Sequence, residues 1–451
     1  MFSVASIPIR DVERPSAVSV LRYVAEIKDP VHGYIYLTEV EKALVDTPPL
    51  QRLHRVKQLA GANLTYPGAE HTRFLHSIGS MHLAGLLARR LLDLGYMKED
   101  DVQKVRMAVL LHDVGHGPFS HTFEEVLDKY RGMTHEDVAG WLIRKSVLAD
   151  VIKDGGYSAK EISQLAVGRL EKTSKRYLNY LVAGHFAPEI LDYLVRDSYF
   201  SGVEYGRIDA HRLINSLDVV DDVLAIEYPG AFHVLEFFII ARLEMFNAVY
   251  FHRTVRAANV MLARAMDLAN RRLKLTSFKT VEDFISLDDL KVLLDLLSLG
   301  KSRERALSVA YNLTKMFVER TLLKCTYELH VHQRDEFFSN ILSKDKIRSQ
   351  IEEEIGEKAC VDPNYVAIDV PTVRSVPVHP MEEKPGEILV FRKAAGKKAV
   401  EKLTEVSPMM ATLAKFVDIV RVYTLPQHRE KVELACEDVL GKKTFATRIS
   451  F

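Results

Sequence analysis

The chain has few cysteines and no long uninterrupted apolar run. Its three cysteines, Cys325, Cys360 and Cys436, match no metal-binding spacing, and this sparse use of thiols favours a reduced, cytoplasmic compartment. The most apolar run, AFHVLEFFIIARLEMF, contains His, Glu and Arg, so we expect no membrane span. The N-terminal sequence MFSVASIPIRDVERP reaches charge and proline too early for a signal peptide.

The sequence also lacks a net charge, because 61 basic residues balance 61 acidic residues. No overall field therefore attracts nucleic acid or a membrane, and any anion site must be local. No internal repeat or low-complexity segment is apparent. At 451 residues and 47% hydrophobic composition the chain can bury a large core. This predicts two or three domains, or one large domain with an accessory one.

Helical periodicity dominates from about residue 36 to 340. Apolar residues recur at spacings of three and four in the segments 37–53, 76–95, 102–113, 135–152, 189–202, 235–252 and 259–273. Gly95 is placed to end one helix, and Thr134, with Asp137 three residues later, is placed to begin another.

The pattern changes near residue 345. YVAIDVP, GEILVF and DIVRVYTL indicate short strands, and SPMMATLAKF and PQHREKVELACEDVLG indicate helices. We therefore predict a mainly α protein, with a helical domain over residues 1–345 and a small α+β accessory domain over residues 346–451.

LLHDVGHGPFSH, residues 110–121, places His112 and Asp113 at an apolar helix end. Adjacent helical residues point about 100° apart, so both can reach one ion only near that end. Neutral imidazole and carboxylate suit Mn, Fe, Ni, Zn or Mg. A lone His-Asp pair is more often an ordinary helix end, so a metal site needs ligands from other helices.

Two other segments carry suitable side chains. EHTRFLHS supplies His71, Arg73 and His76, and FAPEILDYLVRDS supplies Glu189, Asp192, Arg196 and Asp197. One histidine upstream, the His-Asp pair and one carboxylate downstream would make a four-ligand site with positions open for water and substrate. Asp192 and Arg196 also fit an ordinary helix ion pair.

These motifs together resemble the HD-domain deoxynucleoside triphosphate triphosphohydrolases, which include bacterial dGTPases and a mammalian enzyme with a SAM and an HD domain. The resemblance covers about residues 26 to 260 and rests on DPVHGYIYLTEVEKALVDTPPLQRLHRVKQL, YPGAEHTRFLHSIG, LLHDVGHGPFSHTFE, THED and LDYLVRDSYFSG, in this order. It implies an HD-domain helical bundle, a divalent metal, a dNTP substrate and a homo-oligomer.

The resemblance implies His76, His112 and Asp113 as metal ligands. The fourth ligand of relatives is an Asp that aligns with Glu189, which is one methylene longer. We therefore choose Glu189, with Asp192 as the alternative.

Several neighbouring residues are candidates for anion and proton chemistry. Arg73 lies one helical turn before His76, and its planar guanidinium suits phosphate. We expect His116 to bind phosphate and His121, oriented by Glu124, to donate a proton to the leaving group. His135 aligns with a further active-site histidine. We expect the glycines of the turn to let a bulky anion approach.

The resemblance also implies sugar and base contacts. Tyr193 and Asp197 match positions that hold the deoxyribose, and Gln58 matches a substrate-side glutamine. Ile190 stands where relatives often carry Lys. A later basic segment supplies the candidates Tyr250, His252, Arg253 and Arg256; the two arginines would either restore that charge or form a solvated basic face.

Asp46 and Gln51 match residues that help the mammalian relative bind an activating guanine nucleotide. His54 and Ala25 depart from that pattern, so the sequence supports an activating nucleotide only weakly.

Three functions remain at this point. The leading one is a metal-dependent dNTP triphosphohydrolase that releases deoxynucleoside and intact triphosphate. The second is another HD phosphohydrolase, acting on nucleoside monophosphates or phosphodiesters. The third is a nucleotide-binding or nucleic-acid-binding regulator with a weakened site, which the zero net charge opposes.

Overall fold

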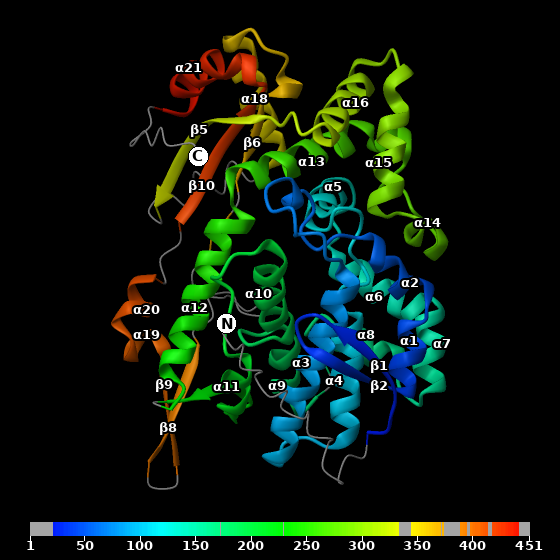
Figure 1. Ribbon diagram of the computed structural model, residues 1–451, viewed down its shortest axis with the longest axis vertical. Helices are drawn as coiled ribbons and strands as arrows, with labels where there is room; N and C mark the ends of the chain where they lie inside the picture. The colour runs from blue at the N-terminus through cyan, green and yellow to red at the C-terminus, as the bar shows by residue number, and fades with distance from the viewer. Residues whose placement is uncertain are drawn as a thin grey trace, which may run out of the picture.

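A computed structural model of the chain describes residues 21–171, 173–228, 230–332, 344–370, 372–373, 388–394, 397–413 and 417–441. The N-terminal segment considered above as a signal peptide lies outside these residues. Helices dominate the described chain (Figure 1), which confirms the mainly α prediction. Within the described part, no helix has both the length and the apolar composition needed to cross a bilayer.

Three apolar helices form the centre of the bundle. α3 (Arg73–Asp93) packs against α4 (Glu99–Leu111) and α10 (Pro188–Ser201). Leu83, Leu87 and Leu91 recur along α3 and are buried, as expected for a helix with an apolar stripe. This packing brings together the three segments that carry the predicted metal ligands.

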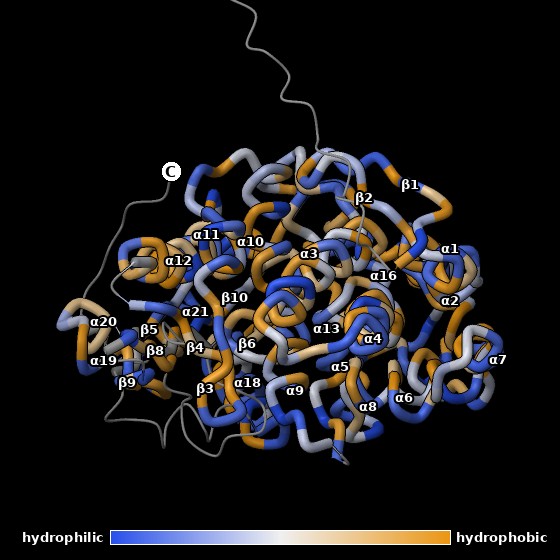
Figure 2. The backbone as a smooth tube through the Cα atoms, turned by 90° about the horizontal axis from the view of Figure 1, so that it is seen from below, coloured by the Kyte–Doolittle hydropathy of each residue, from blue (hydrophilic) through white to orange (hydrophobic). Residues whose placement is uncertain are grey.

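The predicted helix ends are confirmed at two positions. Gly95 has a φ of +83° just after α3, a conformation that glycine adopts without strain. Thr134 caps α6 (His135–Lys145) in a reciprocal capping box with Asp137. Hydrophobic and hydrophilic residues alternate along most helices (Figure 2).

Shorter or more peripheral helices surround this centre. In chain order they are α1 (Glu39–Val45), α2 (Pro48–Arg52), α5 (His121–Arg131), α6, α7 (Val147–Asp154), α8 (Ala159–Leu165), α9 (Tyr177–Ala183), α11 (Ala210–Asn215), α12 (Phe232–Met245), α13 (Arg253–Leu273), α14 (Val281–Ile285), α15 (Asp289–Leu297), α16 (Arg305–Val318), α18 (Asp345–Ala359), α19 (Leu403–Val406), α20 (Pro408–Leu413) and α21 (Arg429–Leu440). A π-helical turn, Phe246–Tyr250, follows α12.

The helical region also contains strands that the helical periodicity did not predict. β1 (Tyr23–Asp29) pairs with β2 (Gly33–Thr38), and β3 (Leu217–Val220) pairs with β4 (Val223–Glu227), both antiparallel. Asp221 and Asp222 have positive φ between β3 and β4, as a two-residue hairpin turn requires. The Asp-Asp pair between two apolar runs was therefore a readable hairpin signal.

The three predicted C-terminal strands are confirmed as β6 (Ala367–Asp369), β8 (Leu389–Ala394) and β10 (Val417–Thr424), and the two predicted helices as α20 and α21. One sheet has the order β5-β10-β6, with β5 at Lys324–His332 and β7 (Thr372–Val373) also on β10. The other has the order β3-β4-β8-β9, with β9 at Lys397–Lys402. Both sheets pair strands that precede residue 345 with strands that follow it. The domain boundary at residue 345 stays a prediction.

Candidate active site

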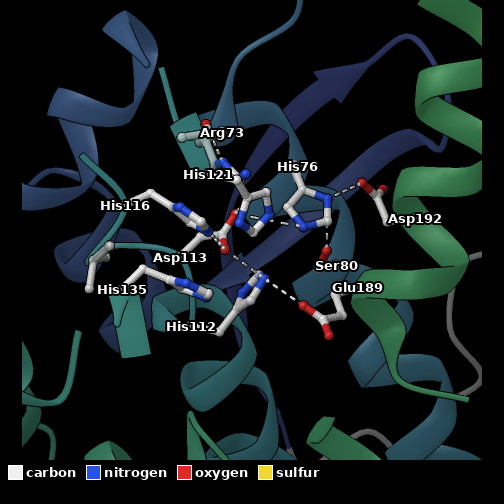
Figure 3. A network of polar contacts seen from close by, with 12 residues as sticks. Arg73, His76, Ser80, His112, Asp113, His116, His121, His135, Glu189 and Asp192 are labelled. Atoms are coloured by element: carbon white, nitrogen blue, oxygen red, sulfur yellow. Dashed lines mark hydrogen bonds and ion pairs between the residues drawn. The ribbon is translucent and has the colours of Figure 1, made fainter. Parts of the chain in front are cut away.

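Two imidazoles from different helices meet at the centre of the site (Figure 3). His76 lies on α3, and its Nδ1 is 2.8 Å from Asp192 Oδ2. His112 follows α4, and its Nδ1 is 2.6 Å from the carbonyl oxygen of Val109. Because both partners are acceptors, each Nδ1 carries a proton, and in the neutral ring each Nε2 keeps its lone pair. The Nε2 of His112 is buried and has no hydrogen-bond partner within the described chain.

Two carboxylates complete this group. His112 Nε2 lies 3.3 Å from Asp113 Oδ1 and 3.5 Å from Glu189 Oε2, and His76 Nε2 lies 3.7 Å from Asp113 Oδ2. One ligand atom each of His76, His112 and Glu189 lies within 4.8 Å of the others. Two free imidazole lone pairs beside two carboxylates are a donor set that fits a divalent metal.

Asp192 lies behind His76, on the side away from that group. Its carboxylate is fully buried and contacts His76 Nδ1, His32 Nε2 at 2.6 Å and Arg196 at 2.8 and 2.9 Å. Burial opposes ionisation of Asp192, but Arg196 and these hydrogen bonds hold its pKa well below the usual range. The geometry therefore places Glu189 with the candidate ligands and Asp192 in the position that orients a ligand histidine.

The ion pair of Asp192 extends to the β1–β2 turn. Arg196 Nη1 donates to Asp29 Oδ2 at 2.8 Å, and both side chains are 0% exposed. Asp29 Oδ1 also accepts from the backbone N–H groups of Val31 and His32. The sequence reading assigned no role to Asp29 or His32, although both lie in the DPVHG motif.

A second cluster lies at the starts of α5 and α6. Glu124 accepts from His121 Nδ1 at 3.0 Å and from His135 Nδ1 at 2.9 Å, and the His116 ring stacks on His135 at 3.9 Å. These four residues could also hold a metal. Burial opposes protonation of His135, but the hydrogen bond to Glu124 prevails and raises its pKa. Burial, with Arg73 and His135 nearby, holds the pKa of His116 well below normal.

Arg73 links the two clusters. Its Nη1 donates to Asp113 Oδ2 and its Nε to Ser120 Oγ, both at 2.8 Å. The guanidinium has five donors in all, so several remain for a bound anion. Burial works against ionisation of Asp113, but Arg73 and the neighbouring histidines hold its pKa well below normal.

The turn between α4 and α5 has an unusual backbone. Phe119 and Ser120 have φ values of 58° and 56°, a region that costs energy for residues with side chains. Arg52 holds the turn, because its buried guanidinium donates to the carbonyl oxygens of Val114 and His116. Asp289 Oδ1 accepts from the N–H of Phe119 at 2.6 Å.

The sequence analysis predicted that the glycines of this turn let a bulky anion approach. The structure gives these glycines a different role. A Cβ at Gly115 would lie 2.0 Å from the carbonyl oxygen of His135, and a Cβ at Gly117 would lie 2.2 Å from the Phe123 ring. Both glycines are therefore needed so that the turn can pack against α6 and α5.

Two of the predicted sugar contacts, Tyr193 and Asp197, follow Glu189 by four and eight residues on α10 and so share its helix face. Asp197 is buried and accepts from His71 Nε2 at 2.8 Å and from the Tyr250 hydroxyl at 2.6 Å. Tyr193 packs edge-on against Tyr250 at 6.1 Å. Gln58 is also buried, and its Oε1 has no hydrogen-bond partner within the described chain.

The sequence analysis did not identify Arg242, which lies on α12, as a candidate site residue. Its guanidinium interacts with Tyr193, Nε and Nη1 are buried, and neither atom has a hydrogen-bond partner in the described part of the chain. Buried donors without acceptors are costly, so these two atoms are candidates for binding an oxygen of a ligand. The apolar run around Arg242 concealed it, because a single arginine there also fits a helix surface.

The other basic candidates lie elsewhere. Arg253 forms two hydrogen bonds with Glu328 on β5, and Arg256 forms two with Asp369 on β6. His252 caps α13 through Nδ1. The structure thus engages both arginines with carboxylates of the β5-β10-β6 sheet, and their substrate role stays a prediction.

The residues considered for an activating nucleotide have local contacts. Asp46 pairs with Lys42, Gln51 donates to the Val45 carbonyl, and His54 stacks on Phe74 at 3.7 Å. An activating nucleotide at these residues stays a prediction.

Known families match most of the chain. An HD domain matches residues 73–177, and an HD-associated region matches residues 208–450. A phosphohydrolase from Bacteroides thetaiotaomicron has a similar solved structure, with a TM-score of 0.68 and 26% identity over 89% of this chain and 99% of that one.

Several curated proteins are similar in sequence. YwfO, an uncharacterized protein of Bacillus subtilis, is 32% identical over 66% of this chain and 70% of its own length. A deoxynucleoside triphosphate triphosphohydrolase SAMHD1 homolog of Dictyostelium discoideum is 30% identical over 71% of this chain and 62% of its own length. An uncharacterized protein of Methanocaldococcus jannaschii is 31% identical, and this chain spans 55% of its length.

The HD domain is metal-dependent, and the His76, His112 and Glu189 group is one that a divalent metal of unknown identity fits. Family matches to both halves of the chain, together with this ligand group, place the protein in the HD-domain phosphohydrolases that carry an HD-associated region.

Proposed function

We propose that the protein is a metal-dependent dNTP triphosphohydrolase, which hydrolyses a dNTP to a deoxynucleoside and triphosphate. The observation that carries this proposal is that Glu189, Tyr193 and Asp197 share one face of α10, at spacings of four residues. Glu189 belongs to the candidate metal group, and Tyr250 contacts both Tyr193 and Asp197. A candidate metal group and a sugar-sized polar group on one helix face suit a nucleotide.

The chain's own residues would bind and orient the phosphates. A divalent metal held by His76, His112, Asp113 and Glu189 would supply charge neutralisation and activation of water. Arg73 has guanidinium donors to spare, and Arg242 has two buried donors without acceptors. Both therefore suit phosphate oxygens.

A proton must reach the leaving oxygen of the deoxynucleoside. His121 is the candidate donor because its side chain is 70% exposed and Glu124 holds its Nδ1 at 3.0 Å. That contact leaves Nε2 free to face a substrate. His135 shares Glu124, so it helps to fix the carboxylate.

The sugar contacts suit a deoxyribose. Asp197 accepts from His71 and Tyr250 but keeps further acceptor capacity for a 3′-hydroxyl. The Tyr193 ring would occupy the space that a 2′-hydroxyl needs. The Dictyostelium relative is named a deoxynucleoside triphosphate triphosphohydrolase homolog, which is consistent with this substrate.

Product identity tests the proposal. The full chain is incubated with each dNTP and NTP plus Mn or Mg, and products are separated by ion exchange. We expect intact triphosphate and deoxynucleoside, and at least about a hundredfold slower reaction in His112→Ala. His233→Ala is the matched control because the His233 side chain is 94% exposed.

Other products would replace the proposal. Orthophosphate or a nucleoside monophosphate would indicate another HD phosphohydrolase activity. Tight nucleotide binding without turnover for any metal would indicate a regulator with a weakened site.

A further inference from the structure

A groove lies at the end of α5 away from the histidine cluster. It has a volume of about 1080 Å³ and is formed by the C-terminal end of α5, by α6 and by the segment after α13. Its cationic and aromatic lining residues that matter here are Arg131, Trp141, Arg144, Arg271, Phe278 and Lys279. Sites for small ligands have volumes of roughly 300–1,000 Å³, so the groove can hold a nucleotide-sized molecule.

The groove is locally basic in a chain with no net charge. Four of the described lining residues are Arg or Lys and one, Asp137, is acidic. Asp137 is already engaged, because it accepts from the N–H and hydroxyl of Thr134 at the start of α6. The cationic side chains of the lining therefore outnumber its one acidic side chain. Arg271 also lies 3.8 Å from Glu304 outside the lining, and an anion would balance the remaining charge.

One wall of the groove is fixed before any ligand binds. Asn270 and Thr276 are buried and joined by hydrogen bonds of 3.0 and 3.1 Å. Arg131 Nη1 donates to the carbonyl oxygens of Thr276 and Phe278. This network holds the Thr276–Phe278 backbone in place beside α5.

Aromatic rings lie next to the cationic groups. Trp141, the single tryptophan of the chain, is half-buried, with its ring centroid 5.9 Å from that of Phe278. The guanidinium of Arg131 lies 4.7 Å above the Phe278 ring. Aromatic rings that stack bases, with Arg and Lys that contact phosphates, are the elements that nucleotide-type ligands need.

We propose that this groove binds a mononucleotide, separately from the metal group, with the base against Trp141 and the phosphates on Arg144, Arg271 and Lys279. Trp141 lies six residues after His135, about 9 Å along α6. A nucleotide in the groove thus contacts the same two helices that carry His121, Glu124 and His135.

The single tryptophan makes the test direct. Trp141 fluorescence of the full chain is followed during titration with ATP, with adenosine and with inorganic tripolyphosphate. We expect a saturable change with ATP and at least about tenfold weaker binding of adenosine and tripolyphosphate, because each lacks half of the contacts. The double variant Arg144→Ala/Lys279→Ala should bind ATP about tenfold more weakly.

The control is Lys153→Ala/Lys160→Ala, which removes two exposed cations that do not line the groove. Circular dichroism checks that each variant is folded. If the double variant is not folded, the single variant Lys279→Ala is titrated with ATP in its place. Because binding is measured instead of turnover, failure of the proposed hydrolysis leaves this test unaffected.

Four results would overturn the proposal. They are no saturable change with ATP, an ATP response that the groove variant leaves unaltered, tripolyphosphate binding as tight as ATP binding, and much tighter binding of a single-stranded oligonucleotide. The third would indicate a simple anion site and the fourth a nucleic-acid site.

Discussion

Single residues around His76 show how the site is oriented. Asp192 accepts from His76 Nδ1 and so leaves Nε2 free for the metal group. Arg196 neutralises Asp192 and is held in turn by Asp29. An ion pair this deeply buried would be costly without all of its partners, and here every partner is present.

Replacing Asp192 by Asn should weaken metal binding. Asn can still accept from His76, but it lacks the charge that raises the basicity of the imidazole, so we expect about a 10- to 100-fold loss of Mn affinity. Calorimetric titration of the purified full chain measures this. Asp150→Asn on the exposed side of α7 is the control. An unchanged affinity in Asp192→Asn would show that Asp192 does not act through His76.

His82 should make folding sensitive to acid. Burial, with His32, Arg106 and His211 nearby and only Asp192 opposing them, lowers its pKa from 6.5 to about 4. The unfolded chain therefore takes up this proton near pH 6.5 and the folded chain only near pH 4. The stabilising effect of neutral His82 is present at pH 7 and is lost as the pH falls through this window.

His82→Gln removes this titration. Between pH 7 and pH 5 the variant should lose about 2 kcal/mol less unfolding free energy than the natural chain. Urea unfolding at both pH values measures the difference, with His233→Gln as the exposed control. Equal losses in all three proteins would refute the assignment.

At the scale of an element, α3 depends on one glycine. An ideal Cβ at Gly79 would lie 2.0 Å from Asp192 Oδ1 and 2.2 Å from Arg196 Nη2. The close approach of α3 and α10 therefore needs a residue without a side chain. This requirement could not be read from the sequence, because it arises only once Asp192 and Arg196 face α3.

Gly79→Ala should destabilise the fold by about 1–3 kcal/mol through overpacking, and it should also weaken metal binding. Gly140→Ala on α6 is a matched control, because its Cβ would meet only the Arg144 guanidinium at 3.4 Å. That variant should be neutral or more stable by about 0.5–1 kcal/mol. Thermal unfolding compares the two; a harmless Gly79→Ala would contradict the packing described.

The turn between α4 and α5 is held by an element distant in sequence. Arg52, at the end of α2, reaches the carbonyl oxygens of Val114, His116 and Leu287. Burial lowers its pKa to about 10, so it remains charged at neutral pH.

Arg52→Lys should loosen this turn, because one ammonium cannot reproduce the planar fork that contacts three carbonyls. Each unpaired buried carbonyl costs about 1–3 kcal/mol. Hydrogen exchange should be faster at the amides of His116 and Ser120. Arg169→Lys, at an exposed pair with Glu136, is the control. Unchanged exchange in Arg52→Lys would mean that other contacts hold the turn.

At the scale of the molecule, the segment after residue 345 is joined to the part of the chain before it by strands and by ion pairs. β10 pairs with β5, and β8 pairs with β4. α13 contributes Arg256 and Arg264, which contact Asp369 and Glu352. The homo-oligomer implied by the family resemblance stays a prediction.

A chain ending at residue 345 should therefore fold poorly. It would leave β4 and β5 as unpaired edges and expose core residues that Val390, Phe391 and Tyr423 now cover. We expect aggregation or no cooperative thermal transition, compared with a control chain ending at residue 441. A cooperative, monodisperse 1–345 fragment would instead support the predicted domain boundary.

The sequence alone determined the helical segments, the His-Asp pair and the histidines around it, because helical periodicity and motif spacing are local properties of the chain. It left Glu189 and Asp192 as alternatives and gave Arg242 no role. Only the tertiary structure placed Glu189 beside His112 and Asp192 behind His76. The reason is physical: which nitrogen of an imidazole is free, and which buried donor has no acceptor, depends on partners far apart in the sequence.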